Sequence, residues 1–130
     1  MNEHILPPAP PAPSTARDIV RSVEPPLAPD AADSLLLMTS EVVSNALRHG
    51  RPQPSQEIVL RVERGPHNVR VEVLNDGPVF VPEPPFQPND ERDGGYGLYL
   101  VDRLSNAWGV EPEGDRTKVW FEVDDDTSDA

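Results

Sequence analysis

The distribution of proline most limits what this 130-residue chain can fold into. Five prolines fall between Pro7 and Pro13, and five more fall between Pro78 and Pro88. Proline has no backbone N–H to donate, so it is excluded from most helix interiors and central strands. We therefore expect residues 1–13 to form an extended, disordered arm. The rest of the chain is long enough for one domain with a single core.

Charge and residue content exclude several kinds of partner. The formal net charge is −12, and no cluster of Lys and Arg offers a surface for nucleic acid or for an anionic membrane. The chain has no cysteine, which excludes disulfides and thiolate metal sites. No signal peptide opens it, and no apolar run approaches the ~20 residues that span a bilayer. We expect a cytoplasmic protein that binds neither nucleic acid nor membrane directly.

Two helices are predicted in the first half of the chain. Ser14 can cap a short helix that runs to Val23. Asp30 or Asp33 can cap a longer one, which ends at Gly50 because glycine favours helix termination. The apolar residues of this second helix form two adjacent rows: Leu35, Met38, Val42 and Ala46, with Leu36, Val43 and Leu47 beside them. These rows cover about half of the circumference, which predicts a helix that packs on a core.

The second half of the chain predicts strands and one further helix. Two alternating segments, 58–64 and 68–75, are joined by a short turn and indicate a β-hairpin. A glycine-rich segment at 94–97 opens a helix, and residues 117–123 form a last strand. Helices and strands do not alternate in this order. The sequence therefore predicts an α+β sandwich, in which helices cover one face of a sheet.

We expect the folded domain to span residues 14–123, between the arm at 1–13 and an acidic, disordered tail at 124–130. Residues 78–93, between the hairpin and the third helix, are rich in proline and in acidic side chains. This segment is long for a simple connection, which is typical of a lid or a binding loop.

Three short segments carry groups that suit a nucleotide. Glu41 and Asn45 lie one turn apart on the second helix, so both can reach one ligand, and their oxygens suit Mg²⁺. Asp76 and Gly77 end a strand, where the carboxylate could accept a hydrogen bond from a base. The glycines of 94–97 let the backbone approach phosphates at a helix N-terminus. Taken singly, the first is better explained as a solvated helix face and the second as a turn, and the third fits a plain loop as well as a phosphate site. Together they predict a site for ATP and a divalent metal.

In this order the segments resemble the motifs of a known superfamily. EVVSNALRHG, VEVLNDGP and DGGYGLYLVDRLSNAWGV resemble the N, G1 and G2 boxes of the GHKL ATP-binding domains, and KVWFEV resembles their closing strand. The resemblance covers residues 14–123 and is nearest to bacterial anti-sigma regulatory factors that act as serine/threonine-protein kinases. It implies a Bergerat-type two-layer sandwich, with a mixed, mostly antiparallel sheet covered on one face by helices.

The resemblance also implies roles for single residues. Glu41 matches the proposed general base, and Asn45 matches the asparagine that binds Mg²⁺. The matches to ATP-binding positions are Asp76 at the adenine amino group, Gly77 as its partner, Gly95 and Gly97 in the phosphate loop, and Thr117 near the adenine. Two departures stand out. No strand is recognisable before Ser14, where the family often has one at the sheet edge and dimer interface, and Asn75 stands where an aspartate is common.

The leading hypothesis is an ATP- and Mg²⁺-dependent kinase that phosphorylates an anti-sigma-factor antagonist, sequesters a sigma factor, or does both. A homodimer would fit the same family. The same pocket would also serve a non-catalytic ATP-binding module that binds a sigma factor or another regulator, and the sequence barely separates the two. A histidine-kinase catalytic fragment is a third interpretation. It is less favoured because no dimerisation and phosphoacceptor segment is recognisable.

Overall fold

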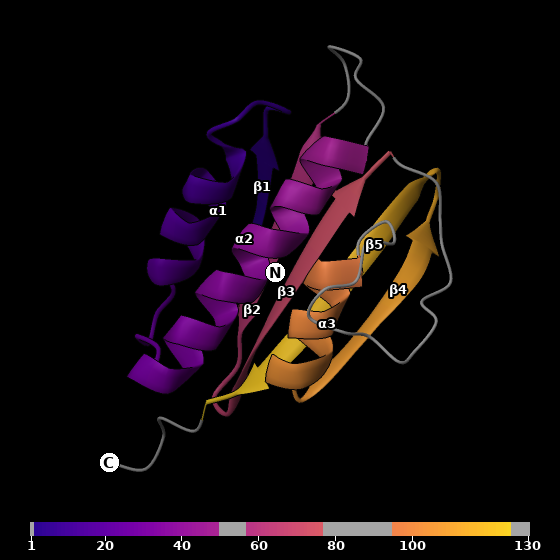
Figure 1. Cartoon of the computed structure of the whole chain (residues 1–130). Helices are drawn as coiled ribbons and strands as arrows, with labels where there is room; N and C mark the ends of the chain where they lie inside the picture. The colour runs from indigo at the N-terminus through magenta and orange to yellow at the C-terminus, as the bar shows by residue number, and fades with distance from the viewer. Residues whose placement is uncertain (1, 50–56, 77–94, 126–130) are drawn as a thin grey trace.

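A five-stranded sheet with helices on one face makes up the described part of the chain (Figure 1). The computed structural model describes residues 2–49, 57–76 and 95–125. Its elements are, in chain order, β1 (Asn2–Leu6), α1 (Ala12–Arg21), α2 (Pro29–His49), β2 (Ile58–Arg64), β3 (Asn68–Asn75), α3 (Gly95–Leu104), β4 (Ala107–Glu113) and β5 (Arg116–Asp124).

The strand order is β1-β2-β3-β5-β4, and each neighbouring pair is antiparallel. The longest ladder joins β3 to β5, from Asn68 opposite Asp124 to Asn75 opposite Thr117. In Figure 1 all three helices lie in front of this sheet. The predicted α+β two-layer sandwich is confirmed. Within the described residues the sheet is antiparallel throughout, although the resemblance implied a mixed one.

Alternation along the strands decides which side chains reach the core between the two layers. Both predicted apolar rows of α2 lie in or against this core, because their spacing puts them on one side of the helix. The strand residues that meet them are Ile58, Leu60, Val62, Val69, Val71, Val73, Phe121 and Val123. No helix of the described residues lies on the other face of the sheet (Figure 1).

The prediction of a disordered arm at 1–13 is wrong. Residues 2–6 form β1, which pairs with β2 and buries Leu6. They precede the first proline, so no ladder hydrogen bond is lost. α1 begins at Ala12 and not at Ser14, and it carries Pro13 in its first turn, where the missing N–H needs no partner. α2 likewise begins at Pro29, so that Asp30 lies inside its first turn.

Two further predictions need correction at the C-terminal end. β4 was not expected, because its sequence AWGVEPE lacks a clear alternation and contains Pro112. It is an edge strand, where a proline is tolerated because one side of the strand needs no partner. The tail was expected to begin at 124, yet Asp124 ends β5 and Asp125 is buried. Residues 126–130 and the expected lid at 78–93 lie outside the described residues.

Candidate functional site

The carboxyl-terminal half of α2 presents the first pair of expected site residues. Glu41 and Asn45 are half-buried, and each has a buried neighbour, Val42 or Ala46, that packs into the core. The pair therefore lies at the border between the packed and the open side of the helix. Arg17 of α1 donates a hydrogen bond to Oγ of Ser40 in α2 at 2.7 Å. Ser40 directly precedes Glu41, so this contact ties α1 to α2 next to the site.

The last pair of the β3–β5 ladder forms the second part of the site. Asn75 lies opposite Thr117, and directly opposed residues of an antiparallel pair project to the same face of the sheet. Thr117 shares its face with Val119, Phe121 and Val123, because side chains alternate along a strand. That face is the one covered by helices. Thr117 is only 2% exposed, so the end of the ladder places a buried Thr117 beside Asn75 on the helix-covered face.

The first turn of α3 forms the third part. Gly95 begins this helix and Gly97 lies two residues later, as the expected phosphate-binding segment requires. Leu98 and Val101 are buried, and this packing fixes the helix against the core. The first backbone N–H groups of a helix have no partner inside it and carry a partial positive charge, which favours an anion at this end.

These three parts meet at one end of the molecule. α2 packs against β3, β5 and α3. In Figure 1 the carboxyl end of α2, the end of β3 and the start of β5 lie at the same end, and the first turn of α3 is its turn nearest to them. The elements that carry Glu41, Asn45, Gly95 and Thr117 are thus brought together. Gly77 lies outside the described residues.

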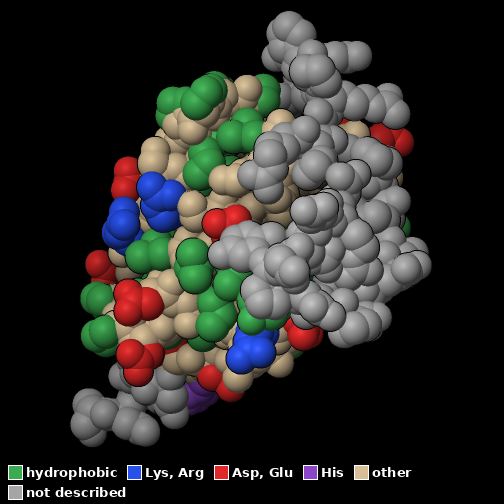
Figure 2. Space-filling model, viewed as in Figure 1, with side chains coloured by type: hydrophobic (Ala, Val, Ile, Leu, Met, Phe, Trp, Pro, Cys, Tyr) green, Lys and Arg blue, Asp and Glu red, His purple; other side chains and the backbone are tan. Residues whose placement is uncertain are grey.

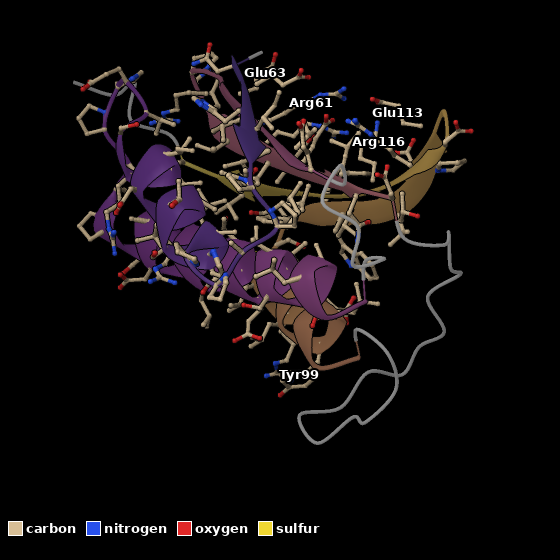
Figure 3. All side chains as sticks on the ribbon, turned by 90° about the horizontal axis from the view of Figure 1, so that it is seen from above. Arg61, Glu63, Tyr99, Glu113 and Arg116 are labelled. Atoms are coloured by element: carbon tan, nitrogen blue, oxygen red, sulfur yellow. The ribbon has the colours of Figure 1, made fainter. Side chains whose placement is uncertain are left out.

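Asp76 has a different neighbour. Its Oδ1 lies 3.5 Å from Nε of Arg116, the first residue of β5. Arg116 alternates with Thr117, and Figure 3 shows it with Arg61 and Glu113 on the side of the sheet away from the helices. Arg116 was not singled out in the sequence. Only the strand register reveals it, since Arg116 and Asp76 each lie one step beyond the Asn75–Thr117 pair.

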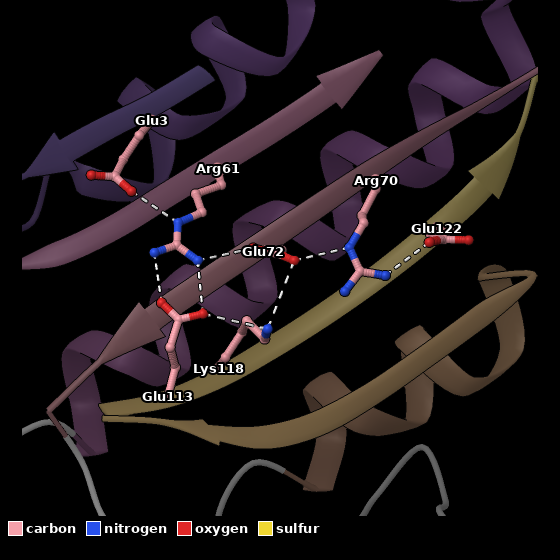
Figure 4. A network of polar contacts seen from close by, with 7 residues as sticks. All are labelled: Glu3, Arg61, Arg70, Glu72, Glu113, Lys118 and Glu122. Carbon is pink, nitrogen blue, oxygen red and sulfur yellow. Dashed lines mark hydrogen bonds and ion pairs between the residues drawn. The ribbon is translucent and has the colours of Figure 1, made fainter. Parts of the chain in front are cut away.

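The helix-free face of the sheet is covered by a network of charged side chains (Figure 4). Arg61 makes two hydrogen bonds to Glu113, of 2.9 and 2.6 Å, and a third to Glu3 at 2.9 Å. Donation to Glu113 and to Glu3 raises the pKa of Arg61, and the bonds that Glu113 accepts from Arg61 lower the pKa of Glu113. Arg70 and Lys118 extend the network. The charges of this network are thus paired with one another on the helix-free face.

On the helix side, the described surface carries more acidic than basic side chains (Figure 2). Figure 2 shows acidic side chains spread over this face and basic ones gathered in two small places. Two large hydrophobic side chains of the described residues, Ile5 and Leu37, are exposed. None of the helices described is long and apolar enough to cross a membrane.

An antiparallel sheet with helices on one face, in which the helix that carries Glu41 and Asn45 packs against the helix that begins at Gly95, suits a nucleotide-binding class of domain. Comparison with known proteins names the family. The chain belongs to the histidine kinase-like ATPase domain family, which it matches over residues 6–123. It is thus a domain of an ATP-binding type. No sequence among curated proteins matches it significantly.

Three solved structures are similar to this fold. The structure of the RsbU and RsbW domains of Rv1364c from Mycobacterium tuberculosis matches with a TM-score of 0.67 and 17% identity, over 96% of this chain and 32% of that one. The blue-light activated histidine kinase EL346 of Erythrobacter litoralis matches with a TM-score of 0.55 and 29% identity, over 75% of this chain and 31% of that one. The mycobacterial sensor histidine kinase MprB matches with a TM-score of 0.53 and 16% identity, over 72% and 74%. This chain spans about a third of the length of the first two.

Proposed function

We propose that this protein is an ATP- and Mg²⁺-dependent serine/threonine-protein kinase of the anti-sigma type. It would phosphorylate an anti-sigma-factor antagonist, sequester a sigma factor, or do both, in the cytoplasm. The observation that carries the proposal is the placement of Glu41 and Asn45, half-buried on one border of α2, which packs against α3. The likeness to a structure containing an RsbW domain agrees with the fold that this function uses.

The residues present fit ATP and Mg²⁺. Asn45 offers an amide oxygen, a hard donor of the kind that Mg²⁺ takes together with phosphate oxygens and water. Gly95 and Gly97 lie at the start of α3, where backbone N–H groups would bind the phosphates. Thr117 and the end of β3 would enclose the base, and the family resemblance gives that contact to Asp76 with Gly77.

Glu41 would supply the catalytic group. A carboxylate one turn from the metal-binding Asn45 is placed to accept the proton of a serine or threonine hydroxyl as it attacks the terminal phosphate. Phosphoryl transfer depends mostly on positioning and on charge neutralisation, so one base, a metal and backbone donors would suffice. The rival function, a non-catalytic ATP-binding regulator, would use the same groups without the proton transfer.

Calorimetric titration of ATP into the purified protein, with and without Mg²⁺, tests the pocket. We expect binding that strengthens with Mg²⁺. No binding by a sample that circular dichroism shows to be folded would overturn the proposal. Incubation with labelled ATP and a candidate antagonist then tests transfer. Binding of ATP and of the partner without transfer would favour the regulatory module. Sedimentation of the same samples tests the expected homodimer.

A further inference from the structure

The identity of the residue that contacts the base follows from the register of β3 and β5. Asn75 and Thr117 are the last opposed pair, and both project to the helix-covered face. Thr117 is buried there. Asn75 is half-buried, at the point where β3 stops and the site begins. The side chain at the end of β3 that shares the face of the other site residues is therefore an amide.

Asp76 is directed elsewhere. Its carboxylate pairs with Nε of Arg116 at 3.5 Å. Side chains alternate along β5, so Arg116 projects to the same face as Lys118, Trp120 and Glu122. This is the helix-free face, where Arg116 lies with the charged network (Figure 3). Both members of the pair are partly exposed, at 31% for Asp76 and 38% for Arg116. To reach a base on the other face, Asp76 would have to leave this partner.

An amide and a carboxylate do not select the same bases. An ionised carboxylate only accepts hydrogen bonds, so it favours the 6-amino group of adenine and opposes a 6-oxo group. An asparagine amide carries both an acceptor oxygen and a donor NH₂. By turning about its last torsion it can accept from a 6-amino group or donate to a 6-oxo group.

We infer that Asn75, and not Asp76, contacts the base, an inference that rests on the proposed nucleotide site. The amide of Asn75 then makes the site tolerant of purine nucleotides with either a 6-amino or a 6-oxo group. Asn75 is then the residue that sets base specificity. Its replacement by aspartate restores strict preference for the 6-amino group.

Titration of ATP and of ITP, each with Mg²⁺, tests the inference, because adenine and hypoxanthine differ only at this edge of the base. We expect the wild-type protein to bind ITP within about tenfold of its affinity for ATP. Asn75→Asp should raise the preference for ATP over ITP by about tenfold to a hundredfold, since a carboxylate in the position of the amide would oppose the 6-oxo oxygen with a second acceptor. Asp76→Asn is the matched control, and should change the preference by less than about threefold.

Any other pattern overturns the inference. A preference that falls in Asp76→Asn would show that Asp76 contacts the base, and an unchanged preference in Asn75→Asp would show that Asn75 does not. In both cases ATP still binds, so the proposed function survives. Loss of binding for both nucleotides in the folded wild-type protein would overturn the proposed function and this inference together. Thermal unfolding of each variant confirms that the fold is kept.

Discussion

Arg64 and Asp125 form an ion pair that is almost completely enclosed, with 3.1 Å between Nη2 and Oδ2 and side-chain exposures of 4% and 2%. Arg64 also donates from Nε to the carbonyl of Pro25 at 3.0 Å. Asp125 accepts a hydrogen bond from the N–H of Ala28, the residue before α2, at 3.1 Å. The pair thus joins the end of β5 to the hairpin of β2 and β3 and to the start of α2.

Replacement of Asp125 by alanine should destabilise the protein strongly. The variant would remove the Asp125 carboxylate from the buried Arg64 guanidinium, and breaking a buried pair on one side costs about 3–5 kcal/mol. Carbonyl groups still accept from Arg64, so we expect the lower part of that range, about 3 kcal/mol. Urea unfolding followed by circular dichroism measures the change.

Asp124→Ala is the control for this prediction. Asp124 carries the same charge one residue earlier, but it is exposed, and its backbone N–H keeps its bond to Asn106. Its replacement should change the free energy of unfolding by less than about 0.5 kcal/mol. Equal losses in the two variants would mean that net charge, and not the enclosed pair, stabilises the C-terminal end.

The parts of the fold that local periodicity determines could be predicted from the sequence. The apolar rows of α2 and the alternation of β2 and β3 each repeat over several residues, and both are found as expected. β1 and β4 were not predicted, because they are the two edge strands of the sheet. An edge strand is paired on one side only and tolerates proline and polar residues, so its sequence carries a weak signal. Asp125 was assigned to an acidic tail because its partner, Arg64, lies 61 residues away.

Gly109→Ala should destabilise the protein by about 1–3 kcal/mol through overpacking. A Cβ atom on Gly109 would lie 2.7 Å from Nε1 of Trp120 and 3.0 Å from two of its ring carbons. Trp120 cannot move away easily, because the guanidinium of Arg70 lies over its ring at 4.1 Å from the centroid. The thermal midpoint and the free energy of unfolding should both fall.

A second glycine provides the comparison for Gly109. A Cβ on Gly65 would also come close to another atom, at 2.6 Å from Oδ1 of Asn68. That atom is the far end of a side chain that can turn aside, so Gly65→Ala should cost less than Gly109→Ala. If the two variants lose the same stability, the loss at Gly109 is not due to the rigid indole.

The stability of the helix-free face should depend on pH through Glu113. The hydrogen bonds from Arg61 lower the pKa of Glu113 in the folded protein from its ordinary value of 4.5. The stabilisation is therefore fully present above pH 4.5 and is lost as the pH falls through the lowered pKa. Glu113 is 39% exposed, so solvent screening limits the contribution to about 1 kcal/mol or less.

The effect is measured by the urea midpoints of the wild type and of Glu113→Gln, from neutral pH down to below the lowered pKa of Glu113. The difference between the two proteins should be largest near neutral pH and should shrink on acidification. Glu63→Gln, on the exposed part of the same face, should show no comparable convergence. A constant gap between wild type and Glu113→Gln at every pH would assign the loss to packing instead of charge.

The candidate site could be predicted only in part, for a physical reason. Glu41 and Asn45 are four residues apart on one helix, so their common face follows from helical geometry alone. The end of β3 is different. Whether Asn75 or Asp76 faces the helices depends on where β3 stops and on its register with β5, which lies more than 40 residues later in the chain. A one-residue shift in that register exchanges the two side chains between faces.

Glu41→Gln should separate binding of ATP from transfer of its phosphate. The amide keeps the size of the carboxylate but cannot accept a proton, so the rate of phosphorylation of an antagonist should fall by about 10²–10⁴-fold. Glu41 is half-buried at the border of α2 and is not part of the buried core, so we expect stability and the Kd for ATP to change little. Calorimetry and transfer of labelled phosphate, on the same preparation, give the two quantities.

Asn45→Ala, one turn further along α2, is the companion variant. It removes the amide oxygen proposed to bind Mg²⁺, so both the Mg²⁺-dependent part of ATP binding and the transfer should be lost together. The two variants together distinguish a catalytic base from a nucleotide ligand. If Glu41→Gln loses ATP binding to the same extent as Asn45→Ala, then Glu41 helps to hold the nucleotide and is not the base. If Glu41→Gln transfers phosphate at the wild-type rate, proton acceptance by Glu41 plays no part in the reaction.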